Sequence, residues 1–286
     1  MTWFDSPADA TARLAGAGYL ADAATATTSY LAGALEKPLL VEGPAGVGKT
    51  ELAKAVSRAI GAGLVRLQCY EGLDEARALY EWNYKKQLLR IQASGDQAWE
   101  QTHDDIFTDE FLLTRPLLTA IRRDEPTVLL VDEVDKTDVE VEGLLLEILS
   151  DFQVTIPELG TVAAVRRPFV VLTSNASREL SEALKRRCLF LHLDYPDAER
   201  EREIVRRQVP DLDERIARQV VDTVGRLRDL ELKKAPSIAE SVDWARTLVA
   251  LEIGDLDERA VAETLGAVLK HASDQERAVK ELRLPR

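Results

Sequence analysis

The chain has 286 residues, of which 45% are hydrophobic and 30% charged, and its 50 acidic and 37 basic residues give a formal net charge of −13. This length favours one large α/β domain with a smaller appendage, and the composition excludes a disordered or fibrous chain. The acidic balance disfavours nonspecific binding to phosphate backbones, because the general field repels them.

The apolar runs are too short to cross a bilayer, and residues 1–10 carry acids but no basic segment. We therefore expect a cytoplasmic protein that does not contact a membrane. The two cysteines, Cys69 and Cys188, lack metal-ligand spacing and cannot form a disulfide framework, so we expect incidental thiols.

Short apolar runs alternate with longer segments of helical period, which is typical of a parallel sheet with helices on both faces. One or two helices are expected within residues 8–34, before the first strand. The predicted strands are Leu39–Glu42, Leu64–Gln68, Val128–Val131, Phe169–Thr173 and Leu189–Leu193.

Two further segments interrupt this alternation. The interval from residue 70 to 127 is too long for a simple crossover and predicts an insertion with extra helical structure, including an amphipathic stretch around Glu81–Gln92. Gln153–Pro157 and Thr161–Val165 predict two short strands of a hairpin.

From residue 196 the pattern is helical to the end, with breaks at Pro210, Ala235-Pro236 and Gly254. The predicted domains are therefore a nucleotide-binding domain over 1–195 and a helical lid over 196–286. The first carries the insertion at about 70–127 and the hairpin at about 153–165.

The first motif, G-x-x-x-x-G-K-[ST], follows the first predicted strand and opens a helix predicted over Thr50–Ile60. Its glycines let backbone N–H groups converge on phosphate oxygens, and the helix N-terminus adds a favourable partial charge. Lys49 is expected to reach the β- and γ-phosphates, and the Thr50 hydroxyl to bind Mg²⁺. The predicted nucleotide-binding residues are Gly43, Pro44, Ala45, Gly46, Val47, Gly48, Lys49, Thr50 and Glu51. They predict a magnesium-dependent P-loop NTPase that uses ATP.

The second motif is the apolar run 127–131 followed by two acids, Asp132 and Glu133. The carboxyl end of such a strand opens onto the crevice where open α/β sheets bind ligands. Asp132 is expected to help hold Mg²⁺, and Glu133 to activate the attacking water. An acidic pair alone would indicate a solvated loop, but its place downstream of a P-loop favours the catalytic interpretation.

Two more sets of polar residues lie beside predicted strands: one follows a strand and the other precedes a strand. Asn175 ends the apolar strand 169–173, and it would orient the water if that strand lay between the P-loop strand and the acidic strand; a turn-forming Asn is the alternative. Arg186 and Arg187 precede the last strand and could supply positive charge to a phosphoryl-transfer transition state, in cis or from a neighbour. Paired arginines are also common on solvated faces.

These elements in this order, followed by a helical tail, resemble the AAA+ ATPases, and the extra segments resemble the MoxR family. The resemblance covers nearly the whole chain. Within that family, three sequence segments are similar to those of the accessory ATPases encoded with molybdenum-copper carbon monoxide dehydrogenase: Leu67–Asp74, Leu79–Tyr84 and Leu189–Pro196.

The resemblance implies a hexameric ring that binds ATP at subunit boundaries. Asn175 then matches sensor 1, Arg187 matches the arginine finger, and Arg186 is its alternate. The insertion after the second strand and the hairpin would face the pore. MoxR proteins act with partner proteins that contain a von Willebrand factor A domain, and they remodel or insert metal into client metalloenzymes.

One departure from the family concerns sensor 2, an arginine that follows a Ser-Pro type turn at the start of a lid helix. Here the segment Ala235–Glu240 offers none. Arg246 and Lys234 remain open as substitutes.

The sequence favours three other functions less. A nucleic-acid motor on the same fold would need a basic stripe or an added DNA-binding domain, and this acidic sequence shows neither. A GTP-driven subunit of a restriction system finds no support, because Asp135-Lys136-Thr137-Asp138 lacks the Asn of a guanine motif. A nonhydrolysing scaffold is disfavoured because no catalytic residue of the motifs is missing.

Overall fold

The computed structural model describes residues 3–94 and 106–285, which form two compact units. The first unit holds the N-terminal residues to Ala17, Ala21–Glu42 and Thr50–His192. The second holds Gly18–Leu20, Gly43–Lys49 and the chain from Leu193 onward. The P-loop residues before Thr50 thus group with the helical part of the chain rather than with the sheet.

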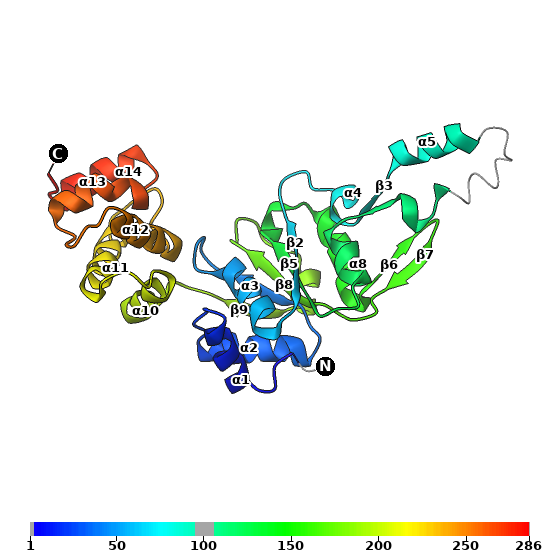
Figure 1. Ribbon diagram of the computed structural model, residues 1–286, viewed down its shortest axis with the longest axis horizontal. Coiled ribbons are helices and arrows are strands. Elements are labelled where there is room, and N and C mark those ends of the chain that lie inside the picture. The colour runs from blue at the N-terminus through cyan, green and yellow to red at the C-terminus, as the bar shows by residue number, and fades with distance from the viewer. Residues whose placement is uncertain (1–2, 95–105, 286) are drawn as a thin grey trace. The chain divides into compact units, whose positions relative to one another are not determined.

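A five-stranded parallel sheet forms the centre of the first unit, as the sequence predicted. Its strands are β1 (Leu39–Glu42), β2 (Gly63–Gln68), β5 (Thr127–Asp132), β8 (Phe169–Ser174) and β9 (Leu189–His192). They lie in the order β2-β5-β8-β1-β9, with every pair parallel (Figure 1). All residues of β5 and β8 are buried, because helices cover both faces of the inner strands.

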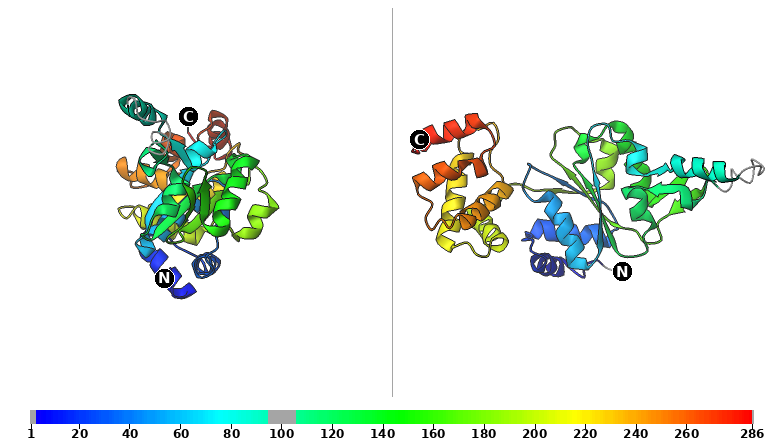
Figure 2. Two further views of the ribbon diagram at one scale, coloured as in Figure 1. Left: turned by 90° about the vertical axis from the view of Figure 1, so that its right-hand side faces the viewer. Right: turned by 45° about the horizontal axis from the view of Figure 1, so that its top comes forward.

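Alternate residues of the strands point to opposite faces of the sheet. On one face, residues such as Leu40, Leu129 and Leu172 pack into a core with α7 (Pro116–Arg122) and α8 (Val139–Asp151). On the other lie α1 (Pro7–Gly16), α2 (Ala23–Ala34) and α3 (Lys49–Ile60), seen as blue helices in Figure 2. The N-terminal segment follows the same face, where the Trp3 and Phe169 rings meet edge to face at 5.9 Å.

The insertion contains more than the predicted helices. Its elements are α4 (Glu75–Ala78), β3 (Tyr80–Trp82), α5 (Tyr84–Ser94), the 3₁₀ helix η1 (Asp109–Phe111) and β4 (Leu112–Thr114). The helix expected over Glu81–Gln92 was wrong at its start, because Glu81 and Trp82 belong to β3, which pairs antiparallel with β4. The Trp82 ring also packs edge to face on Phe107, 5.2 Å away. These tertiary partners, distant in sequence, override the local helical period. Part of the predicted insertion, residues 95–105, lies outside the described residues.

The hairpin predicted within residues 153–165 is present. It consists of β6 (Gln153–Ile156) and β7 (Gly160–Ala163), which pair antiparallel. Gly160 has φ of 80°, the left-handed conformation that glycine adopts readily in a tight turn. Between β5 and α8 lies the 3₁₀ helix η2 (Val134–Lys136), and α9 (Glu182–Arg187) precedes β9.

The second unit is a bundle of helices, as the sequence predicted for this region (Figure 1). The helices are α10 (Ala198–Gln208), α11 (Glu214–Arg228), α12 (Ile238–Ala250), α13 (Glu258–Val268) and α14 (Ala272–Glu281). Trp244 of α12 is fully buried at their centre and donates from Nε1 to Thr264 Oγ1 at 2.7 Å. Across residues 3–94 and 106–285, no helix combines the length and the apolar character that a membrane crossing needs.

Candidate nucleotide site

The P-loop runs from the end of β1 to the start of α3 and is shaped by its glycines. Gly46 and Gly48 have φ of 77° and 97°, in the left-handed region that favours glycine. A Cβ atom at Gly46 would lie 2.0 Å from Ser237 Oγ, and one at Gly43 would lie 1.9 Å from the Leu193 carbonyl oxygen. The loop therefore needs glycine both for its backbone and for its close packing within the helical unit.

Lys49 lies against this loop. Its side chain is buried, and its Nζ donates to the carbonyl oxygens of Gly43 and Pro44, each at 2.7 Å. An ammonium at this position, beside a glycine-rich loop at the start of a helix, suits a bound anion, because charged donors and the helix N-terminus both favour negative charge. The P-loop thus has the chemistry of a phosphate cradle.

Asp132 ends β5 as a buried carboxylate with several donors around it. Its Oδ1 accepts from Thr50 Oγ1 at 2.9 Å and from Thr173 Oγ1 at 2.6 Å. Its Oδ2 accepts from Arg66 Nε at 3.1 Å and from Arg66 Nη2 at 2.5 Å. The first residue after the P-loop lysine and the acidic strand therefore meet directly in the first unit.

The donor set fits Mg²⁺. A hydroxyl and a carboxylate, both hard oxygen ligands, lie 2.9 Å apart at Thr50 Oγ1 and Asp132 Oδ1. Mg²⁺ is bound in such proteins through one or two protein oxygens, with water and substrate phosphates completing its shell. Thr50 and Asp132 are the residues that would hold the ion.

Glu133 has an unusual backbone conformation, with φ of 59° and ψ of 49°. Its N–H donates to Thr173 Oγ1 at 2.9 Å, so the same threonine contacts both acids of the pair. The Glu133 carboxylate accepts at Oε2 from Gln68 Nε2 at 3.1 Å and from Lys136 Nζ at 2.5 Å. The hydrogen bond and the negative charge of Glu133 raise the pKa of Lys136 above its ordinary value. In this arrangement the proposed base is held by an amide and an ammonium.

Asn175 follows β8, and β8 lies between the P-loop strand β1 and the acidic strand β5. This is the strand order on which the predicted role of Asn175 depended. Asn175 is half-buried, and its backbone N–H donates to Asp135 Oδ1 at 3.2 Å.

The two arginines before β9 end helix α9, and both are exposed. Arg187 Nη1 donates to the Leu146 carbonyl oxygen of α8 at 3.2 Å. Exposure at a helix end is what a group would need in order to reach a neighbouring subunit, so both arginines stay candidates for the finger.

The segment before α12, which offers no sensor 2 arginine, is closely packed within the second unit. Ser237, which follows Pro236, caps α12 together with Glu240 and is the residue that Gly46 approaches. Lys234 Nζ lies 3.5 Å from Glu240 Oε1. Arg246 follows Ser237 by nine residues, or two and a half helical turns, so it lies on the opposite side of α12, where it pairs with Asp243 at 3.4 Å. Of the two substitutes, only Lys234 lies near the capped helix start.

The cysteines have no reactive character. Burial raises the pKa of Cys188 to about 12. Burial, with the charges of Asp132, Asp135 and Glu133, raises the pKa of Cys69 to about 12. Both thiols therefore stay protonated and unreactive near neutral pH.

Sequence reasoning missed four residues at this site: Arg66, Gln68, Thr173 and Lys136. Arg66 and Gln68 alternate at the carboxyl end of β2 and so share one face of the strand. Two polar side chains at the end of an otherwise apolar strand are a signal, but assigning them requires the knowledge that β2 pairs with β5.

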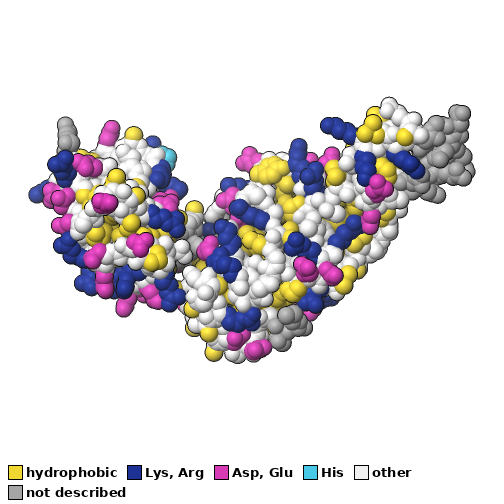
Figure 3. Space-filling model, in the orientation of Figure 1, with side chains coloured by type: hydrophobic (Ala, Val, Ile, Leu, Met, Phe, Trp, Pro, Cys, Tyr) yellow, Lys and Arg dark blue, Asp and Glu magenta, His cyan; other side chains and the backbone are white. Residues whose placement is uncertain are grey.

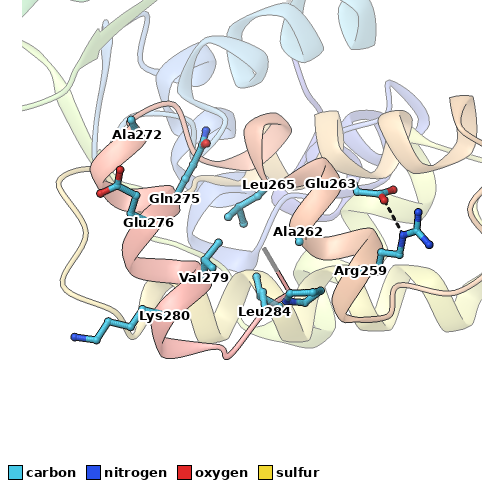
Figure 4. A pocket seen from close by; sticks show the side chains of 11 residues that line it. Arg259, Ala262, Glu263, Leu265, Ala272, Gln275, Glu276, Val279, Lys280 and Leu284 are labelled. Carbon is cyan, nitrogen blue, oxygen red and sulfur yellow. Dashed lines mark hydrogen bonds and ion pairs between the residues drawn. The ribbon is translucent and has the colours of Figure 1, made fainter.

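The second unit also contains a groove between α13 and α14 (Figure 4). Its floor is apolar, with Leu265, Val279 and Leu284, and at its rim Arg259 Nε donates to Glu263 Oε1 at 2.8 Å. No described lining residue is a cysteine or histidine, and the groove brings no phosphate-binding motif together.

Comparison with known proteins identifies related sequences. The family model described as AAA domain, dynein-related subfamily, matches residues 38–188, more than half of the chain. An uncharacterized protein of Staphylococcus haemolyticus is 26% identical over 254 residues, which cover 85% of this chain and 88% of that protein. An uncharacterized protein of Staphylococcus aureus strain NCTC 8325 shows the same identity and coverage.

Solved structures with a related fold include two forms of RuvB from Thermotoga maritima. A point mutant of it has a TM-score of 0.49 at 16% identity, covering 98% of this chain and 71% of that one. The structure described as the Holliday junction branch migration motor has a TM-score of 0.42 at 17% identity, covering 86% and 62%. At these TM-scores the likeness carries no argument about function.

Proposed function

The chain belongs to the dynein-related subfamily of AAA domains, and from this premise we propose that it hydrolyses ATP with Mg²⁺. One observation carries the proposal. Thr50, directly after the P-loop lysine, donates its hydroxyl to Asp132 at 2.9 Å, and Glu133 follows Asp132 at the end of the same strand. The two proposed ion ligands therefore meet within the first unit, and the proposed base directly follows one of them in the chain.

Each residue has a distinct role in the proposal. The P-loop N–H groups and Lys49 bind the phosphates and neutralise charge that develops on them. Thr50 and Asp132 hold Mg²⁺, which neutralises the phosphate oxygens when it is bound. Glu133 accepts a proton from the attacking water, and Asn175 orients that water.

Beyond the reaction, we propose a MoxR-type remodelling ATPase that works as a ring, with hexamers as the expected state. The partner would carry a von Willebrand factor A domain, and the client would be a metalloenzyme. The insertion and the hairpin support this proposal as projecting segments outside the central sheet. Only the three similar sequence segments suggest molybdenum-copper carbon monoxide dehydrogenase as the client. The related proteins are uncharacterized and do not support this choice.

A nucleic-acid motor is a second candidate that we do not favour, because the sequence carries a formal net charge of −13. On the face of the helical unit seen in Figure 3, Lys and Arg side chains alternate with Asp and Glu side chains. A strand-tracking surface would gather positive charge along one groove.

Two substitutions test the proposed reaction. Lys49→Ala is expected to abolish binding of a fluorescent ATP analogue. Glu133→Gln is expected to retain that binding while phosphate release falls by roughly 100-fold or more, because the base is lost and the phosphate contacts remain.

Lys270→Ala is the control, since Lys270 is an exposed lysine that follows α13, and its Nζ donates to the carbonyl oxygens of Gly266 and Ala267. It should leave binding and turnover unchanged. Normal hydrolysis by Glu133→Gln would refute the assignment of the base.

A further inference from the structure

Arg66 is a charged residue of the site to which the proposed reaction gives no role. Resting on that proposed function, we propose that Arg66 is a positioning residue, a tethered cation that holds Asp132 while Mg²⁺ is absent and gives way when Mg²⁺ binds. The nucleotide site would then be preorganised without its ion, and ion binding would be tuned by competition within the chain.

The hydrogen bonds of Asp132 support this role. A carboxylate offers about four acceptor positions, and here four donor contacts reach it: two hydroxyls at Oδ1 and two guanidinium nitrogens of Arg66 at Oδ2. The side chain of Asp132 is only 3% exposed. A carboxylate buried to this extent is unfavourable without a counter-charge, and Arg66 supplies it.

The position of Arg66 allows it to leave. β2 is an edge strand of the sheet, and the Arg66 side chain is 47% exposed although its partner is buried. The guanidinium can therefore swing into water without breaking the strand pairing of β2 with β5. Two cations cannot both neutralise the same small carboxylate at full strength, because their own charges repel each other.

A second contact joins this pair to the base. Arg66 Nη2 also donates to Gln68 Oε1, and Gln68 Nε2 donates to Glu133 Oε2 at 3.1 Å. Arg66 and Gln68 lie two residues apart on the same face of β2. Displacement of Arg66 thus frees one end of the amide that holds Glu133.

Ordinary surface ion pairs of this chain differ from this one. Arg77 and Asp74, for example, are 3.0 Å apart with side chains 58% and 54% exposed, so water already solvates both charges. Loss of the cation is strongly unfavourable only where the acid is buried, because the acid is then left as an uncompensated charge away from water. Arg77 is therefore the matched control.

The experiment compares Arg66→Gln, Arg66→Lys and Arg77→Gln with the unmodified chain. For each, the affinity of a fluorescent ATP analogue is measured with saturating Mg²⁺ and with a chelator, and the ratio of the two affinities reports the coupling between ion and nucleotide. Arg66→Gln is expected to raise this ratio by roughly fivefold, because the competing cation is gone. Arg66→Lys, which keeps the charge, and Arg77→Gln are expected to keep the ratio of the unmodified chain.

A second readout is the unfolding midpoint without Mg²⁺ and nucleotide. Arg66→Gln is expected to lower this midpoint relative to the unmodified chain. Addition of Mg²⁺ and nucleotide should bring the two midpoints together. If the unmodified chain binds nucleotide and the affinity ratio of Arg66→Gln is unchanged or smaller, the inference is overturned and the proposed function stands. If the unmodified chain binds no nucleotide, both fail.

Discussion

Asp135 is a buried acid whose hydrogen bonds hold the segment around Asn175. Its Oδ1 accepts from the Asn175 N–H at 3.2 Å, and its Oδ2 accepts from the Ser177 N–H at 3.0 Å and from Ser177 Oγ at 2.6 Å. Burial alone would raise the pKa of Asp135, but these hydrogen bonds to the ionised form outweigh it and hold the pKa below the ordinary value of 3.8. The charged carboxylate therefore positions the end of β8.

Asp135→Asn is predicted to destabilise the fold at pH 7 by about 1 to 3 kcal/mol, because the amide NH₂ would face the donors of Ser177. Because the folded pKa is depressed, the contribution of Asp135 is complete above the unfolded pKa and is lost as pH falls through the folded one. The difference in unfolding free energy, measured with urea, should therefore shrink below about pH 4.

The control for this prediction is Asp138→Asn. Asp138 is the N-cap of α8 and accepts from the N–H groups of Glu140 and Val141, each at 3.1 Å. Asn caps helices nearly as well as Asp, so little change is expected. A stability gap for Asp135→Asn that stayed constant down to pH 3 would contradict the electrostatic account.

For single residues, the sequence predicts a role where the residue belongs to a contiguous motif, because its neighbours along the chain identify it. The P-loop is contiguous, and Asp132 and Glu133 directly follow an apolar run, so a local pattern finds them. Thr173 and Arg66 reach Asp132 from strands on either side of β5, 41 and 66 residues away in sequence. Their contacts depend on strand order, which no local pattern carries.

Among the elements, the three helices α10, α11 and α12 of the second unit are joined by one buried ion pair. Arg228 donates to Glu201 through Nη1 at 2.6 Å and Nη2 at 2.8 Å, and Ser241 Oγ donates to the same carboxylate at 2.6 Å. Arg228 Nε also donates to the Pro236 carbonyl oxygen at 2.8 Å. Since Pro236 precedes Ser237, this network fixes the helix start against which Gly46 packs.

Arg228→Met is predicted to lower the unfolding free energy by about 3 to 5 kcal/mol, because it leaves the Glu201 carboxylate buried without a counter-charge. The double variant Glu201→Leu with Arg228→Met should recover most of that loss. Chemical denaturation monitored by the fluorescence of the buried Trp244 measures both.

An exposed pair gives the comparison. Arg259 and Glu263 lie 2.8 Å apart on α13 with side chains 81% and 60% exposed, so Arg259→Ala is expected to change the unfolding midpoint little. If the double variant proved no more stable than Arg228→Met, the buried charge would not be the cause.

The central strands were predictable because burial on both faces leaves continuous apolar runs, and the predicted strand ends differ from those observed by one residue at most. β3 and β4 were not. They are three residues each, and Tyr80-Glu81-Trp82 has no alternation long enough to separate a strand from the first turn of the following helix.

For the whole molecule, the proposed ring predicts that activity depends on assembly. If Arg187 reaches a neighbour's nucleotide, specific ATPase activity should rise with protein concentration as light scattering detects larger particles. Arg187→Ala should lose turnover by roughly 1,000-fold or more while still binding ATP.

Arg186→Ala is the matched variant on the same helix end, and it distinguishes the two candidates for the finger. Equal specific activity at all concentrations, from a chain that stays monomeric with ATP, would refute the ring. It would leave the chemistry of the P-loop and the acidic strand in place.

The left-handed backbone of Glu133 also bears on how this position can change over generations. That conformation is unfavourable for most side chains by roughly 1 to 2 kcal/mol, whereas Gly, Asn and Asp adopt it more readily. Replacing Glu133 with Gly or Asn would remove the carboxylate base and relieve the backbone together, so such a variant is expected to lose hydrolysis without losing the fold. Lineages that have turned from motors into nucleotide sensors are therefore expected to carry Gly or Asn here more often than Gln or Ala.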